Sequence, residues 1–336
     1  MRDPAFWWRP PGLAARVLWP AAALYGALTA RRMAQGGAQA EVPVICVGNF
    51  TLGGTGKTPT AIAITEALRS LGEMPFFLTR GYGGRESGPL RVQPNDRATD
   101  IGDEPLLLAR AAPVIVSRDR AAGAALARAE GATAIVMDDG LQNPALQKDL
   151  SFAVIDARRG FGNGYVFPAG PLRAPIARQM PHVHALIAIG TGPGVSQTEA
   201  LAQQHGRLLL RASLAPDQSV LESLRERPLL AFAGIGDPQK FFATLTEAGL
   251  DMRARVSFPD HHPYSERDAR DLLEQCRKKN LLPVTTEKDL VRLAGRDGAL
   301  SELAVMARAL PVTLMFEEQH RLRDILRKAL QEHRTG

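Results

Sequence analysis

The sequence predicts an α/β protein with a mostly parallel sheet, a second, smaller α/β domain and an N-terminal amphipathic membrane helix. Three features lead to this prediction: a glycine-rich loop directly after an apolar run, a regular alternation of apolar runs with helical stretches, and an apolar, tryptophan-rich N-terminus. We expect residues 1–36 to form the membrane helix, 37–215 the first α/β domain, and 216–336 a second domain that closes over the first.

The glycine-rich loop lies between the apolar run at 44–47 and a helical stretch at 59–71. In such a loop, backbone N–H groups surround phosphate oxygens, a lysine neutralises phosphate charge and the next threonine can hold Mg²⁺. The positive end of the following helix favours the same anion. We therefore predict a P-loop NTPase-like domain, with a glycine-rich turn that binds no phosphate as the alternative, because the usual pattern has glycine where this chain has Thr51. The predicted phosphate-binding residues are Thr51, Leu52, Gly53, Gly54, Thr55, Gly56, Lys57 and Thr58.

The composition is that of an ordinary globular protein, with 45% hydrophobic and 23% charged residues in a chain of 336. Its two cysteines, Cys46 and Cys276, fall in a predicted strand and a predicted helix. We therefore expect neither a disulfide framework nor a zinc site, and a reducing compartment fits. The net charge of +6 favours an acidic partner and leaves a nucleotide, an anionic lipid or a nucleic acid open.

The first 36 residues indicate a membrane segment. Residues 13–29 are apolar apart from Arg16 and Thr29, and the three tryptophans of the chain are Trp7, Trp8 and Trp19. Tryptophan is enriched at the boundary between lipid and water, and the apolar run is shorter than the ~20 residues that span a bilayer. We expect a helix lying in the interface, with a single span or a helix packed on the protein core as alternatives. The charge distribution does not fit a cleavable signal peptide.

Apolar runs recur along the chain at a spacing that suits alternating strands and helices. We expect strands at 44–47, 76–79, 114–117, 134–137, 152–155, 185–189, 207–212, 229–233, 253–258, 282–285 and 311–316. We expect helices at 105–111, 120–130, 238–248, 265–279, 302–309 and 320–332. Residues 191–196, rich in Gly, Pro, Ser and Thr, are expected to form a turn, and residues 216–227 a linker.

Acidic residues lie at two positions that suit a phosphate site. Asp138 and Asp139 end a predicted buried strand, and the carboxyl end of a parallel strand is where a P-loop enzyme holds Mg²⁺ or its waters. We predict both as metal ligands with Thr58, and a simple turn at Asp139-Gly140 is the alternative. Asp103 lies where a loop meets a helix and, considered alone, is expected to cap that helix.

Three further segments carry charged or aromatic side chains after strands. Residues 258–264 include Asp260, His261 and His262, which suggests a metal site, a histidine oriented by aspartate for proton transfer, or packing of one histidine. The loops at 80–84 and 160–173 are suited to an anion, since each carries an arginine beside glycines. Ordinary surface charge is the alternative for each basic residue.

Taken in order, these motifs resemble the tetraacyldisaccharide 4'-kinases, the lipid A 4'-kinase family of Gram-negative bacteria. The similarity extends over nearly the whole chain, and it also accounts for Thr51 in the phosphate loop. The matching segments are the N-terminus and residues 48–49, 53–59, 80–84, 102–104, 138–140, 170–173, 260–262 and 286–289.

The resemblance implies a kinase that uses ATP and Mg²⁺ to phosphorylate the 4'-hydroxyl of a tetraacyl glucosamine disaccharide 1-phosphate, giving lipid IVA. It implies this lipid and the anionic inner-membrane surface as partners, on the cytoplasmic face, with neither a nucleic acid nor an obligate protein partner. By motif position, Asp103 is the catalytic base and His261 its partner across the domain cleft. Contacts to the sugar phosphate or nucleotide phosphates are expected from Arg80, Tyr82, Arg120, Gln142 and Arg173.

The chain departs from the family pattern at Asn143, where the family usually has histidine, and at Ala174, where it usually has glutamate. Any role that the family assigns to that histidine and glutamate therefore does not transfer to this chain.

The main alternative function is a soluble P-loop NTPase that drives a partner protein, but the guanine-reading Asn-Lys-x-Asp motif is incomplete at residues 287–289. A nucleic-acid-binding module is a further alternative, and few aromatic residues are interleaved with the basic ones.

Overall fold

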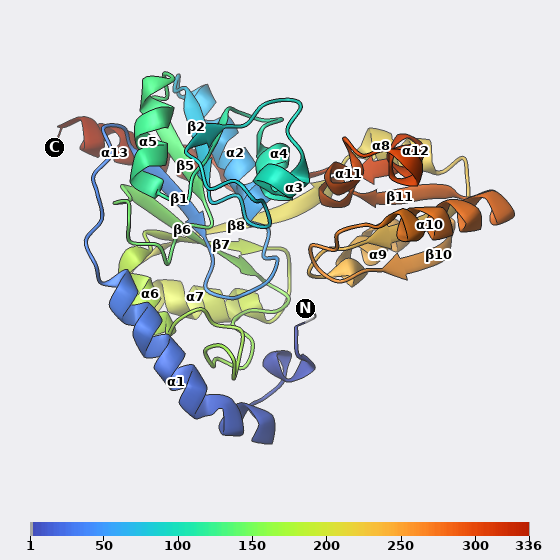
Figure 1. Cartoon of the computed structure of the whole chain (residues 1–336). Helices are drawn as coiled ribbons and strands as arrows, with labels where there is room; N and C mark the ends of the chain where they lie inside the picture. Colours follow the sequence, from blue (N-terminus) through green and yellow to red (C-terminus); the bar gives the residue numbers. More distant parts are fainter. Residues whose placement is uncertain (1–2, 336) are drawn as a thin grey trace.

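The computed structural model describes residues 3–335, which form two sheets flanked by helices (Figure 1). From edge to edge, the larger sheet contains β13 (Val312–Phe316), β8 (Leu208–Pro216), β7 (Ala185–Ile189), β6 (Leu150–Asp156), β1 (Val44–Gly48), β5 (Ala134–Asp138), β2 (Pro75–Thr79), β4 (Val114–Val116) and β3 (Leu90–Arg91). The two edge pairs, β13 with β8 and β3 with β4, are antiparallel, and the inner pairs are parallel. The predicted α/β fold with a mostly parallel sheet is confirmed.

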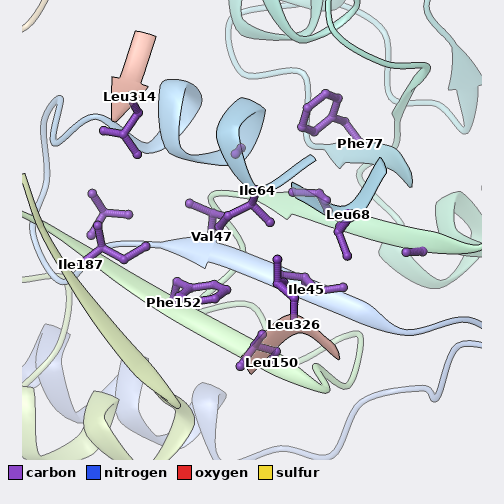
Figure 2. Packing of buried hydrophobic residues seen from close by; sticks show 14 of the residues in the cluster. Ile45, Val47, Ile64, Leu68, Phe77, Leu150, Phe152, Ile187, Leu314 and Leu326 are labelled. Carbon is purple, nitrogen blue, oxygen red and sulfur yellow. The ribbon is translucent and has the colours of Figure 1, made fainter. Parts of the chain in front are cut away.

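The larger sheet is apolar on both faces because helices cover both. Along β1, Ile45 and Val47 point into one core and Val44 and Cys46 into the other. Figure 2 shows the first of these cores, in which strand side chains meet Ile64 and Leu68 and the C-terminal Leu326. A fully buried side chain of this size contributes about 1.5–3 kcal/mol, so these contacts hold β1 and the loop after it in place.

The helices divide between the two faces of the larger sheet. The face in Figure 2 is covered by α2 (Lys57–Ser70), α4 (Asp103–Leu108) and α13 (Gln319–Thr335), with α3 (Ala98–Ile101) next to α4. The opposite face is covered by α5 (Arg120–Ala129), α6 (Ile176–Gln179), η2 (Met180–His182) and α7 (Gly194–Gln204).

The smaller sheet is fully parallel and has its own two cores. Its strands, from edge to edge, are β10 (Met252–Ser257), β9 (Leu229–Ala233), β11 (Leu282–Thr286) and β12 (Arg308–Leu310). One face carries α8 (Gln218–Leu224) and α9 (Pro238–Glu247), and the other carries α10 (Glu266–Lys279), α11 (Glu287–Leu293) and α12 (Gly298–Met306).

The C-terminal part of the chain differs from the predicted second domain at 216–336. β13 pairs with β8 at the edge of the larger sheet, from Val312 opposite Pro216 to Phe316 opposite Ala212. α13 then packs on α2, with Leu326 fully buried. The chain therefore returns to the first domain after β12. A strand pattern in the sequence does not say which of two sheets the strand joins, and that is why this assignment was wrong.

Four local predictions also need correction. The predicted linker at 216–227 contains α8, which Asp217 caps by accepting from Ser219 N and Val220 N. The predicted turn at 191–196 opens α7. The helix predicted at 302–309 ends earlier, at Met306, and the short strand β12 follows. The helix predicted from residue 59 begins at Lys57, because Gly56 caps it.

A long apolar helix, α1 (Leu13–Met33), follows a short turn of helix, η1 (Ala5–Trp8), and lies beside α6 (Figure 1). It continues through Pro20 and is long and apolar enough to cross a membrane by length and composition alone. Three of its four buried residues are small, namely Ala15, Ala22 and Gly26, and the fourth is Met33 at its end. A Cβ added at Gly26 would lie 3.4 Å from Pro175 Cδ. Its outer side carries large apolar residues, so its two faces differ in side-chain size rather than in polarity. The exposed ones include Leu13, Val17, Trp19, Leu24 and Leu28.

Candidate active site

The glycine loop lies between β1 and α2 at the carboxyl edge of the larger sheet. Gly56 has a left-handed backbone (φ 91°) and caps α2, a conformation that favours glycine. Asn49 Nδ2 donates to Thr55 Oγ1 over 3.1 Å and braces the loop from within. Lys57 and Thr58 open the helix, so their side chains share its positive N-terminal end.

The backbone conformation at position 51 explains why the loop has threonine where the usual pattern has glycine. Thr51 is extended and forms an antiparallel bridge with Leu172, while Leu52 N donates to Pro171 O over 2.8 Å. Arg173 reinforces the same contact, because its Nε donates to Thr51 O over 3.0 Å. An extended residue has no need of the conformational freedom of glycine, so the loop keeps its shape with threonine at this position.

Two adjacent carboxylates face the loop from the end of β5. Asp139 has a positive φ of 54°, which is uncommon outside glycine and asparagine, and it turns toward Lys57 and Arg173. Its carboxylate lies 3.6 Å from Lys57 Nζ and 3.1 Å from Arg173 Nη2. Burial raises the Asp139 pKa, but these two positive charges outweigh burial and lower the pKa to about 2.

Asp138 has the opposite environment. It is buried, and neither of its carboxylate oxygens has a hydrogen-bond partner among the described residues. Burial and the nearby charge of Glu104 raise the Asp138 pKa to about 7. An unpartnered buried carboxylate beside a phosphate loop fits a hard cation such as Mg²⁺, which takes oxygen ligands and needs few from the protein. Within residues 3–335, no group of three or more His, Cys, Asp or Glu is arranged to hold a metal by itself.

Asp103 and His261 come from different domains and meet where the two domains are in contact. Asp103 begins α4, and His261 Nδ1 lies 3.2 Å from its Oδ2. His261 has a positive φ of 54°, held by its own N–H, which donates to Gly234 O over 3.1 Å. Such a backbone costs about 1 kcal/mol or more and is often found at functional sites. The structure brings the two predicted residues together.

Arg292 completes this group and was not predicted from the sequence. Its Nε donates to Asp103 Oδ2 over 2.7 Å, and its Nη2 pairs with the same oxygen. Burial opposes ionisation of Asp103, but the hydrogen bond from His261 and the charge of Arg292 hold the Asp103 pKa well below its usual range. The hydrogen bond to Asp103 in turn raises the His261 pKa. Asp103 is therefore ionised, and His261 keeps its proton to a higher pH than usual.

Helix α11 of the second domain contacts α4 and brings two cations to it. Lys288 Nζ donates to Glu104 Oε1 over 2.8 Å, four residues before Arg292 on the same helix face. Asp289 anchors this helix inside the second domain by accepting from Gly234 N over 3.0 Å and from Tyr264 Oη over 2.9 Å. Residues 286–289 were identified from the sequence as a segment that matches the family, but their pairing with α4 requires knowing how the two domains pack.

The other predicted contact residues have varied surroundings. Tyr82 is exposed, and its ring lies edge-on to His261 at a centroid distance of 5.3 Å. Arg80 is exposed at the end of β2. Arg120 is 2% exposed, donates to Ser117 O over 2.9 Å and has an unpartnered Nε. Gln142 Nε2 donates to Asn49 O and to a neighbouring glutamine, each over 2.7 Å.

His262 lies outside this group. Its ring stacks on Phe258 and its Nε2 lies 3.1 Å from Asp268, the residue that closes the capping box of α10. The alternative of a paired-histidine metal site is therefore not supported by the geometry.

At the two positions where the chain departs from the family pattern, Asn143 accepts from Ala145 N over 2.9 Å in a turn, and Ala174 is fully buried.

The fold and the glycine loop define a P-loop NTPase-like protein of the α/β class. The family model of the tetraacyldisaccharide-1-P 4'-kinases matches residues 14–331. The chain is similar to a tetraacyldisaccharide 4'-kinase of Rhodopseudomonas palustris (strain BisB5), with 52% identity over 100% of this chain and 98% of that protein. It is also 55% identical to one of Methylobacterium nodulans over 95% of this chain and 93% of the relative. The chain belongs to the tetraacyldisaccharide 4'-kinase family.

A solved structure has the same fold. LpxK from Aquifex aeolicus, crystallised in complex with ATP, superposes with a TM-score of 0.72. The match covers 95% of this chain and 100% of that one at 24% sequence identity.

Proposed function

We propose that this member of the family is a kinase that transfers the terminal phosphoryl group of ATP to the 4'-hydroxyl of a tetraacyl glucosamine disaccharide 1-phosphate, giving lipid IVA. The observation that carries the proposal is the Asp103–His261 pair, 3.2 Å apart, at the cleft beside an intact Gly-Lys-Thr loop. A family match over nearly the whole chain supports the substrate class.

The phosphate loop binds and neutralises the nucleotide. Backbone N–H groups of residues 53–56 and the positive end of α2 would face the nucleotide phosphates, and Lys57 supplies a charge, whereas the N–H of Leu52 is already bound to Pro171 O. Its present partner is Asp139, 3.6 Å away, so the lysine is already oriented at the loop. Arg173 holds Asp139 and Thr51 together and is proposed to act mainly by positioning.

The residues that would hold Mg²⁺ are Asp138, Thr58 and Asp139. When bound, the ion would neutralise charge on the phosphates. The unpartnered oxygens of Asp138 are what favour this assignment.

The proton transfer is assigned to Asp103. Its carboxylate accepts the proton of the 4'-hydroxyl, the hydroxyl oxygen forms a bond to the terminal phosphorus, and the bond to the bridging oxygen breaks, so that ADP leaves. Arg292 and His261 lower the basicity of Asp103 but fix its orientation. Phosphoryl transfer depends mainly on positioning and on stabilisation of charge, so an oriented carboxylate suits this step.

The acceptor is proposed to be held by exposed groups around this pair, chiefly Arg80 and Tyr82, with Arg120 and Gln142 acting from behind. An acylated acceptor leaves a bilayer only at a cost of about 0.8 kcal/mol per buried CH₂. The outward apolar face of α1 suits an enzyme that stays at the cytoplasmic face of the inner membrane and meets the acceptor there.

A direct assay tests the proposal. The protein is incubated with ATP, Mg²⁺ and the acylated disaccharide 1-phosphate in detergent, and mass spectrometry is used to find a product heavier by one phosphate. Lys57→Ala should remove most of this activity, because one positioned charge at a transferring phosphate is worth about 10²-fold or more. Circular dichroism checks that the variant is folded. Absence of product with the intact protein, or full activity of a folded Lys57→Ala variant, rules the proposal out.

A further inference from the structure

The N-terminal segment, residues 3–8, is docked on the loop that follows β6. Trp7 is 5% exposed, and its Nε1 donates to Pro168 O over 3.0 Å. Asn163 fixes the same turn, because its backbone N donates to Trp7 O over 2.7 Å. These contacts place the segment against the larger domain, although it precedes the apolar helix α1.

Arg159 lies where the N-terminal segment, the loop after β6 and the second domain meet. Its Nη1 lies 3.1 Å from Asp3 Oδ2, and its Nη2 lies 3.2 Å from Asp237 Oδ2 at the start of α9. Its guanidinium carbon lies 4.7 Å from the centre of the Trp8 ring. A planar guanidinium can make two ion pairs and stack on an aromatic ring at the same time, which a lysine cannot.

The same two partners of Arg159 lie next to the phosphate loop. A Cβ added at Gly53 would lie 3.4 Å from Asp3 Oδ2. A Cβ added at Gly236, the residue before Asp237, would lie 3.4 Å from Gly54 N. The N-terminal segment and the second domain therefore approach the phosphate loop side by side, with Arg159 between them.

We propose that Arg159 is a positioning residue that couples docking of the N-terminal segment to closure of the second domain over the phosphate loop. The inference rests on the proposed kinase function, since closure over ATP is the step that it assists. Opening the cleft separates Arg159 from Asp237 and leaves the guanidinium with Asp3 and Trp8 alone. Nucleotide binding and docking of the segment then favour each other, because coupling between two sites is reciprocal. The segment leads into α1, so the apolar helix and the cleft are physically joined.

The tryptophans make this coupling measurable. The three in the chain are Trp7, Trp8 and Trp19, so a Trp19→Phe variant emits only from the N-terminal segment. We would titrate this variant with a non-hydrolysable ATP analogue and Mg²⁺, following tryptophan emission, and measure nucleotide binding separately by calorimetry. The expected result is a change in emission that saturates with the calorimetric binding curve.

Two variants in the same background identify the residue responsible. Arg159→Ala should remove most of the emission change and weaken nucleotide binding by about threefold to tenfold, the scale of a partly buried ion pair with a cation–π contact. Asp237→Asn, which breaks the same link from the other domain, should act in the same direction. Arg158→Ala is the matched control. Arg158 also pairs with Asp237, but within residues 3–335 it pairs with neither Asp3 nor Trp8, so most of the emission change should remain.

The outcomes separate this inference from the proposed function. If the nucleotide binds and the lipid is phosphorylated but emission from the Trp19→Phe variant does not change, the coupling is wrong and the kinase stands. If Arg159→Ala and Arg158→Ala behave alike, Arg159 has no special part and the inference also fails. If no nucleotide binds, both the proposed function and this inference are wrong.

Discussion

Two neighbouring carboxylates show how strongly local surroundings decide chemistry in this site. Asp138 and Asp139 are consecutive, yet burial near Glu104 raises the Asp138 pKa to about 7, whereas Lys57 and Arg173 outweigh burial and lower the Asp139 pKa to about 2. Under the proposed assignment, the first would exchange a proton for a cation, and the second is a negative charge paired with Lys57 and Arg173.

This difference predicts proton release. A carboxyl group with a pKa near 7 is about half protonated at pH 7, and a bound cation displaces that proton. Binding of a Mg²⁺–nucleotide complex at pH 7 should release about half a proton from Asp138, more at lower pH and less at higher pH, because the raised pKa leaves the group increasingly ionised as pH rises. Calorimetry in buffers of different ionisation enthalpy measures the release. Asp138→Asn should abolish it, and release that is unchanged in this variant would contradict the assignment.

Only those site residues that lie within recognisable short motifs could be predicted from the sequence. Asp103 and His261 stand in recognisable segments, and the structure brings them within 3.2 Å. Arg292 was missed because its partner is 189 residues away, in the other domain. The available signal was its spacing of four residues from Lys288, which places two side chains on one face of a helix, but no helix was predicted there and the spacing identifies no partner.

At the scale of elements, the hydrophobic pattern predicts whether a segment is a strand or a helix better than it predicts which sheet the strand joins. The buried strands β5, β7 and β9 follow their apolar runs closely, since a strand covered on both faces is apolar throughout. The strand β13 was also predicted, but assigned to the wrong sheet. Its alternating burial is typical of an edge strand, and an edge strand can close either sheet.

Because the C-terminal helix packs in the larger domain, a mutation in its core should destabilise that domain. Leu326 of α13 is fully buried in the core of the larger sheet, so Leu326→Ala should lower the free energy of unfolding by about 2–5 kcal/mol there. Leu303→Ala is the matched control, since Leu303 is equally buried in the second domain. Hydrogen exchange followed by mass spectrometry should show loss of protection in β1 for the first variant and in β9 for the second. Loss of protection in the second domain alone for Leu326→Ala would restore the predicted boundary.

The outer face of α1 predicts membrane binding that depends on individual leucines. Leu24 and Leu28 are 64% and 59% exposed. Replacing either with Gln should weaken binding to anionic phospholipid vesicles about tenfold, because transfer of a leucine out of water contributes about 1.5–3 kcal/mol. Point variants are preferable to deletion of residues 1–32, which would also remove the contacts of Asp3 and Trp7.

The control for this prediction is Val305→Gln, which changes an apolar residue of the second domain that is even more exposed, at 76%. Vesicle sedimentation compares the three variants, and nucleotide affinity should be the same in all of them. Equal weakening by Val305→Gln would mean that exposed apolar surface in general, rather than α1, binds the membrane.

At the scale of the whole molecule, the candidate site is completed only when the two domains meet. The larger domain supplies the phosphate loop, Asp103 and Glu104, and the second domain supplies His261, Lys288 and Arg292. We propose that a site divided in this way is assembled only with the two domains together, an arrangement that would exclude water and limit wasteful hydrolysis of the nucleotide.

The division of the site between domains leads to the sharpest prediction, which concerns Asp103 and His261. If His261 acts by orienting Asp103, the two form one functional unit, and their losses should be strongly non-additive. We expect Asp103→Ala and His261→Ala each to lower kcat by about 10²-fold or more, with the double variant little worse than the poorer single one. Nucleotide affinity serves as the control, because neither side chain belongs to the phosphate loop. Losses that multiply in the double variant would show that the two residues act independently, and Asp103 would then be left with the structural role of beginning α4.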